Sequence, residues 1–175
     1  MSEELRFPVG KFELPRTVTP EMRAKFIQTI EQLPPNLKEA VEDLSDEQLN
    51  TTYRPGGWTL RQVVHHIADS HLNSFCRFKL GLSEDAPTIK TYDEASWAEM
   101  ADSKDAPVEL SLSIIDGLHA RWTRLLKSMS DADFEKKVNH PERGPMNLNE
   151  LLALYDWHNC HHTAHITKTK EINGW

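Results

Sequence analysis

The chain has 175 residues, which is enough for one domain with a sizeable hydrophobic core. Its 27 acidic and 20 basic residues give a formal net charge of −7, which argues against nucleic acid and anionic membrane surfaces as partners. We see no secretory signal, no apolar run that could span a bilayer, and only two isolated cysteines, Cys76 and Cys160. A cytoplasmic protein with a single domain over residues 1–175 is therefore expected.

The first third of the chain begins with an arm and continues as a helix. Residues 1–18 mix proline, glycine and alternating apolar residues, and we expect an extended arm. The Thr-Pro pair at 19–20 can cap and start a helix whose apolar residues recur at helical spacing. The Pro-Pro pair at 34–35 should kink or break this helix before it resumes. Residues 45–49 have the pattern of a short capped turn.

Two further long helices are expected in the middle of the chain. Thr59 can cap the first, which should end near Gly81. Asp93 can cap a short helix in the segment that follows. Asp105, two residues before Pro107, can cap the second long helix.

The last third of the chain completes the predicted fold. Residues 130–134 resemble a second capped turn, and residues 138–146 are typical of a short hairpin or ordered loop. Asn147 or Asn149 can cap a final helix that runs almost to the end of the chain. Four long helices, short accessory helices and almost no strand predict an all-α four-helix bundle.

Histidines gather on the last predicted helix. Four of the nine in the chain fall within eight residues, at His158, His161, His162 and His165. At ~100° per residue, all four project within one ~100° sector of the helix. Imidazoles four residues apart can reach one metal ion at about 2.0–2.1 Å, and the pairs 158/162 and 161/165 have this spacing. We interpret the cluster as a metal site that lacks the glutamate of a metalloprotease motif and needs a third ligand from elsewhere.

A second group of histidines lies on the helix that begins after Thr59. His71 falls in the middle of the apolar stripe of this helix and should point into the core. His65 and His66 lie on opposite flanks of the same stripe. Metal sites in bundles are built from inward side chains on facing helices, but spacing alone does not choose the third ligand.

Two motifs resemble those of the DinB/YfiT-like superfamily. The segment Gly57–Ser70, GWTLRQVVHHIADS, is similar to the first motif, and His158–His165, which ends in HHTAH, is similar to the second. The opening residues 5–10 and the closing Gly-Trp also resemble the YfiT-type branch, so the resemblance covers nearly the whole chain. It implies a four-helix bundle in which three histidines hold one divalent metal ion per chain: His66, His161 and His165.

The resemblance also implies what the site does. YfiT-like members are described as metal-dependent hydrolases, in which a three-histidine site with open positions can activate a bound water. Related members are thiol S-transferases that use bacillithiol-type cofactors, which is the first alternative, and a non-catalytic metal-binding dimeric bundle is the second. Zinc is the first choice of metal, with nickel and manganese also suited to histidine ligation. A small-molecule substrate and a homodimer are expected.

Several residues near the motifs have two possible interpretations. Asp69 and His162 could orient a ligand through its other ring nitrogen, and His65 could replace His66 as the first ligand. Asn73 and Arg77 continue the flank of His66 and could bind a polar substrate, although we favour a solvated flank. Three aromatic residues could line a pocket, although core packing is the commoner role at this spacing: Trp58, Tyr155 and Trp157. No general base is identified.

Overall fold

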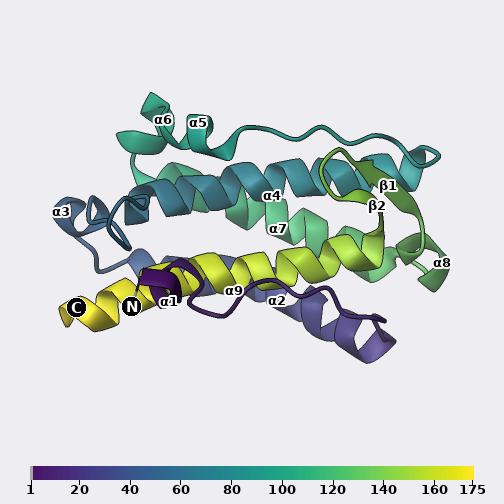
Figure 1. The fold of residues 1–175 in the computed structure, drawn as a ribbon, viewed down its shortest axis with the longest axis horizontal. Coiled ribbons are helices and arrows are strands. Elements are labelled where there is room, and N and C mark those ends of the chain that lie inside the picture. Colours follow the sequence, from purple (N-terminus) through teal and green to yellow (C-terminus); the bar gives the residue numbers. More distant parts are fainter. Residues whose placement is uncertain (1) are drawn as a thin grey trace.

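Four long helices form the body of the protein in the computed structural model, which describes residues 2–175 (Figure 1). They are α2 (Pro20–Val41), α4 (Leu60–Ser83), α7 (Val108–Ser128) and α9 (Leu148–Asn173). Helices α2 and α4 each pack against both α7 and α9. The predicted four-helix bundle is therefore confirmed.

Short elements decorate the bundle and match the predicted segments closely. Helices α3 (Asp46–Leu49) and α8 (Asp131–Phe134) are the two capped turns, and α5 (Glu94–Ala98) and α6 (Ala101–Lys104) lie in the segment between α4 and α7. Strands β1 (Lys137–His140) and β2 (Gly144–Asn147) pair antiparallel, with Val138 opposite Met146. No helix within residues 2–175 is both long and apolar enough to cross a membrane.

The starts of α4 and α9 are set by reciprocal side-chain caps. The Thr59 hydroxyl accepts from the Gln62 N–H, and the Gln62 side chain accepts from the Thr59 N–H. Asn147 and Glu150 make the same pair of bonds at the start of α9. Of the two predicted candidates, Asn147 and Asn149, it is therefore Asn147 that caps this helix. These boxes satisfy amide groups that a helix leaves without partners in its first turn.

Helix α2 continues through Pro34 and Pro35, so the predicted break, one of the two expected outcomes with a kink, does not occur. A proline inside a helix removes the N–H that would bond to the carbonyl four residues earlier. For Pro34 that carbonyl belongs to Ile30, and it accepts instead from the His119 Nδ1–H of α7 at 2.6 Å. A contact with another helix therefore supplies the hydrogen bond that the proline removes.

Two other predicted boundaries are wrong. The N-terminal arm is not extended throughout, because α1 (Ser2–Arg6) is a short helix with Glu3 and Glu4 in its first turn; Met1 lies outside the described residues. Asp105 does not cap α7, which begins at Val108 behind Pro107 without a side-chain cap. The Asp105 N–H instead donates to the Ala101 carbonyl and closes α6.

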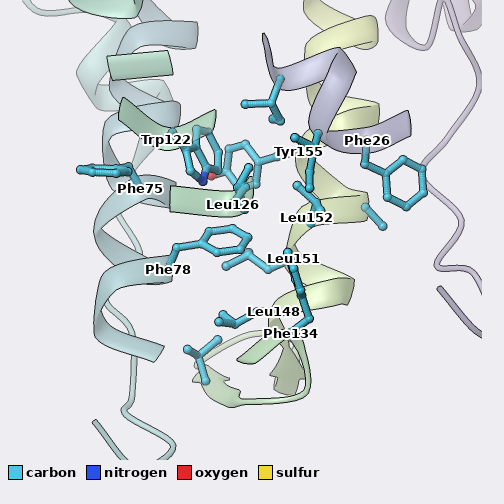
Figure 2. Packing of buried hydrophobic residues seen from close by; sticks show 14 of the residues in the cluster. Phe26, Phe75, Phe78, Trp122, Leu126, Phe134, Leu148, Leu151, Leu152 and Tyr155 are labelled. Atoms are coloured by element: carbon cyan, nitrogen blue, oxygen red, sulfur yellow. The ribbon is translucent and has the colours of Figure 1, made fainter. Parts of the chain in front are cut away.

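The hydrophobic core has two parts with a polar layer between them. The first lies toward the hairpin, where Phe78 of α4, Trp122 of α7 and Leu151 of α9 pack together (Figure 2). The second lies toward α3 and includes Leu60 of α4 and Ile166 of α9. Between Tyr155 and Ile166, α9 carries the clustered histidines, so the bundle places polar groups where the two apolar parts meet.

Candidate metal centre

A cavity of about 500 Å³ opens beside the histidine layer. Side chains of α4 and α9 line it, together with residues of the N-terminal arm, of the loops on either side of α4 and of the β1–β2 turn. Five of the histidines on α4 and α9 line this cavity: His66, His158, His161, His162 and His165.

These five histidines form two overlapping groups that could each hold a metal ion. Ring nitrogens within 4.8 Å of one another join His66, His158 and His162 in one group, and His161, His162 and His165 in the other. His162 belongs to both groups. The three predicted ligands are divided between the two groups, with His66 in the first and the pair from α9 in the second, and no group contains all three.

Burial keeps the five clustered imidazoles neutral. Desolvation lowers the pKa of His66 to about 4, with a further contribution from His165. The same cause lowers the pKa of His161 to about 3 and that of His165 to about 4, and it holds those of His158 and His162 well below 6.5. A neutral imidazole has one ring nitrogen with a free lone pair, and this neutral form is the one that binds a metal ion.

His65 is turned away from this cluster. Its Nδ1 lies 2.7 Å from the Ser111 hydroxyl and its Nε2 lies 3.1 Å from the Ala106 carbonyl. Both ring nitrogens therefore have partners on or beside α7, and the residue does not line the cavity. His66, its neighbour, does.

His71 is fully buried, as predicted, and belongs to a line of three histidines that crosses the bundle. His119 Nδ1 donates to the Ile30 carbonyl, which can only accept, so the lone pair of a neutral His119 is on Nε2. That nitrogen lies 2.8 Å from His71 Nδ1, which must donate. His71 Nε2 then accepts from His158 Nδ1–H at 3.0 Å.

This line of bonds fixes the tautomer of His158. Its proton is on Nδ1, so its lone pair is on Nε2, at the wall of the cavity. The Nε2 atom lies 3.3 Å from the Ser70 hydroxyl and 3.3 Å from His66 Nε2. A carbonyl of α2 thus determines, through three rings, which nitrogen His158 presents to the cluster.

The N-terminal arm covers the other end of the cluster. The Arg6 carbonyl lies 3.3 Å from His165 Nε2, so this nitrogen is the donor and Nδ1 carries the lone pair. The Phe7 ring lies 6.0 Å from that of His161, and Trp157 Nε1 donates to the Gly10 carbonyl at 3.0 Å. The arm therefore orients one predicted ligand and packs against another.

The remaining predicted residues divide into those at the cavity and those outside it. Trp58, Tyr155 and Trp157 all line the cavity, and Tyr155 is also part of the core. Asp69 does not line it, and no hydrogen bond joins its carboxylate to a clustered histidine within residues 2–175. Burial, followed by the charge of Asp102, raises the pKa of Asp69 to about 6.

The sequence interpretation gives one residue of the site the wrong environment and omits two others. Arg77 lies on a buried wall of the cavity rather than on a solvated flank, with 8% of its surface exposed. His119 and His140 were not singled out, because neither lies near another histidine in the sequence. Only the packing of α7 against α4, and of the hairpin against α4, brings them to their partners.

Comparison with known proteins agrees with this geometry. A sequence profile of the DinB superfamily matches residues 29–166. The chain belongs to the DinB superfamily. Within the superfamily, it is 46% identical to YfiT from Bacillus subtilis, whose solved structure covers 98% of this chain and 99% of its own with a TM-score of 0.95. That structure is described as a probable metal-dependent hydrolase with an unusual four-helix-bundle topology.

Relatives in two other Bacillus species match almost end to end. A protein of Bacillus mycoides strain KBAB4 is 53% identical over 173 residues, covering 99% of both chains. A protein of Bacillus cereus strain B4264 is 52% identical over 172 residues, covering 98% of this chain and 99% of its own. Both are provisionally named metal-dependent hydrolases. The resemblance to the DinB/YfiT-like superfamily in the sequence is thus confirmed.

Proposed function

We propose that this protein is a divalent-metal-dependent hydrolase whose metal ion is held by His66, His161 and His165. The proposal is carried by the convergence of neutral imidazoles from two facing helices on the wall of one open cavity. The provisional naming of the relatives as metal-dependent hydrolases agrees with it. Held by three imidazoles, a divalent ion supplies a Lewis acid that can lower the pKa of water.

The ring nitrogens of His161 and His165 support the assignment of these two residues as ligands. His161 Nδ1 is buried and has no hydrogen-bond partner among the described residues. A buried polar nitrogen without a partner is costly, and a metal ion would satisfy it. His165 donates from Nε2 to the Arg6 carbonyl, which puts its lone pair on Nδ1, 3.3 Å from His162 Nδ1, and matches the usual orientation of a metal-ligating histidine.

His158 already has a hydrogen-bond partner at each of its ring nitrogens. Its Nδ1 donates to His71, and its Nε2 can accept from the Ser70 hydroxyl. Both nitrogens therefore have protein partners. We assign His158 and His162 the task of surrounding and orienting the ligands, with His158 held in place by the buried line to Ile30.

The metal content of purified, untagged protein tests the ligand assignment. We expect one divalent ion per chain by elemental analysis, and zinc is our first choice over nickel or manganese. His66→Ala, His161→Ala and His165→Ala should each lose it. The matched control is His65→Ala, which should keep it because both His65 nitrogens are bonded elsewhere.

Two results would contradict the proposal. Wild-type protein that stays free of metal after reloading would remove the metal site altogether. Full metal content in two of the three ligand variants, with loss in His158→Ala and His162→Ala, would move the site to the first histidine group. With metal established, a screen of ester, amide and phosphoester hydrolysis follows, and turnover that requires a low-molecular-weight thiol would favour the S-transferase.

The remaining features of the proposal concern partners. A cavity of about 500 Å³ suits a small-molecule substrate. The homodimer expected from the resemblance stays a prediction, and light scattering on the purified protein would test it.

A further inference from the structure

The cavity is basic although the protein is acidic. The chain carries a formal net charge of −7, yet four arginines line this cavity: Arg6, Arg54, Arg77 and Arg143. None of the four forms an ion pair with a carboxylate among the described residues. Two glutamates also line the cavity, Glu94 and Glu142; both are exposed, as are Arg6 and Arg143, and the arginines outnumber the glutamates by two. An acidic protein that gathers unpaired arginines in one cavity concentrates positive potential there.

Arg77 is the most informative of these arginines because it is buried without a counter-ion. Its Nη2 donates to the Lys90 carbonyl at 3.0 Å and its Nη1 to the Tyr155 hydroxyl at 3.4 Å. Its Nε is buried and has no partner within residues 2–175. A buried guanidinium without a carboxylate is costly, so its charge is left available for a ligand.

His140 presents a second donor at the same end of the cavity. Its Nδ1 accepts from the backbone N–H groups of Glu142 and Arg143, at 3.2 and 3.3 Å. The proton of the neutral ring is therefore on Nε2, which has no hydrogen-bond partner among the described residues. Arg77 and Arg143 line the cavity together with His140, and burial, followed by the charges of these two arginines, lowers the pKa of His140.

The spacing along α4 separates this group from the histidine cluster. His66, Ser70 and Arg77 all line the cavity, and their spacings of four and eleven residues place them on one face of α4. At 1.5 Å per residue, the Cα atoms of His66 and Arg77 are ~16 Å apart. Between them the hydroxyls of Ser70 and Tyr155 lie 3.3 Å apart. The cavity thus extends along α4 from the histidine cluster, beside which Arg6 and Arg54 lie, to Arg77.

We propose that Arg77, His140 and Arg143 form an anion-binding subsite that holds a carboxylate or phosphate group of the substrate. Arginine is suited to such groups because its planar fork matches two oxygens. The bound molecule lies along α4, with its anionic end at this subsite and its reacting end at the histidine cluster. That the anion is the substrate rests on the function proposed above, whereas the binding of the anion does not.

Calorimetric titration of the full-length protein tests the subsite directly. Inorganic phosphate and the dicarboxylate glutarate are titrated separately at pH 8, where the clustered histidines are neutral, with and without prior treatment with EDTA. Wild-type protein should bind at least one of them in both states. Binding of one probe alone identifies which oxyanion the subsite prefers.

The variants assign the binding to the subsite. Arg77→Met keeps the aliphatic length of the side chain and should weaken binding about tenfold to a hundredfold, since it removes hydrogen bonds from a charged group. Arg143→Gln, at an exposed position, should weaken it severalfold. Arg16→Gln removes one exposed arginine outside the cavity and should leave the Kd unchanged.

The outcomes separate this inference from the proposed function. Equal binding by wild-type protein and folded Arg77→Met, or no binding of either probe, would overturn the subsite. Binding that disappears with EDTA but not with Arg77→Met would assign the anion to the metal and would also overturn it. Binding that persists in metal-free protein and in His66→Ala supports the subsite even if the metal proposal fails. Should Arg77→Met not fold by circular dichroism, unchanged binding in Arg143→Gln would decide against it.

Discussion

At the scale of single residues, one carbonyl group decides the tautomers of three buried histidines in a line, His119, His71 and His158. Pro34 leaves the Ile30 carbonyl without its helical donor, and His119 Nδ1–H donates to this carbonyl instead. Each ring in the line then has one donor and one acceptor, so His71 and His158 can adopt only one neutral tautomer each. A helix-breaking residue in α2 is thus coupled to the lone pair that His158 presents at the cavity.

His71→Ala should separate the structural from the metal-binding histidines. The variant removes a fully buried ring and leaves His119 Nε2 and His158 Nδ1 without their partner. We expect a loss of about 2–4 kcal/mol in the free energy of unfolding, measured by urea denaturation. Metal content should stay at one ion per chain, and a metal-free but folded variant would show that His71 belongs to the site.

The same variant should respond less to acid. Burial lowers the pKa of His119 to about 4 and holds that of His71 well below 6.5 in the folded state. As the pH falls, these histidines therefore take up protons in the unfolded protein before they do so in the folded protein. Their contribution to the free energy of unfolding is complete above pH 6.5 and is lost as the pH falls from 6.5 towards 4. With one such group removed, the unfolding free energy of metal-free His71→Ala should fall less steeply over this window than that of wild-type protein.

At the scale of elements, Gly81 allows the hairpin and α9 to approach α4 closely. A Cβ at this position would lie 2.9 Å from Val138 Cγ1 and 3.0 Å from Leu148 Cδ2, and both neighbours are fully buried. Arg77 lies one helical turn before Gly81, and His140 lies two residues after Val138 on β1, so the approach joins the two elements that carry them. The contact is therefore part of the proposed anion subsite as well as of the core.

Gly81→Ala should destabilise the protein by about 1–3 kcal/mol through overpacking, despite the better helix propensity of alanine. Gly117→Ala in α7 is the matched control, because nothing lies within 4 Å of its added Cβ and the position is exposed. The control should gain about 0.5–1 kcal/mol. Thermal or urea unfolding of the Gly81→Ala and Gly117→Ala variants measures both changes in stability. If the two substitutions stabilised the protein equally, the contact between the hairpin and α4 would be loosely packed.

The elements also show what a sequence can reveal here. Periodicity and caps such as Thr59 predicted the four helices, because these signals are local. The histidine spacing predicted the cluster on α9 for the same reason. The continuity of α2 through Pro34 depends on the contact between Ile30 and His119, which are 89 residues apart, and the burial of Arg77 depends on Lys90 and Tyr155. Neither contact leaves a pattern in the neighbouring sequence.

At the scale of the whole molecule, the chain closes its candidate site with its own N-terminus. The arm before α2 crosses α9, and α1 packs on that helix (Figure 1). Its backbone supplies the Arg6 carbonyl to His165 and the Gly10 carbonyl to Trp157, whose ring stacks on His161 at 4.3 Å. The arm therefore orients both α9 ligands of the proposed metal without contributing a ligand itself.

Deletion of residues 2–10, with the initiating Met retained, should weaken metal binding while the bundle stays folded. The deletion removes the Arg6 carbonyl, which orients His165, and the Phe7 ring, which lies beside His161. Their loss should raise the Kd for zinc about tenfold to a hundredfold, as for other outer-shell partners of metal-ligating histidines. Competition with a chromophoric chelator measures this change. Arg6→Ala is the control, since it removes the side chain but keeps the carbonyl, and its zinc affinity should match that of wild-type protein. If the truncated protein bound zinc as tightly as the full chain, the arm would cover the cavity without orienting its ligands.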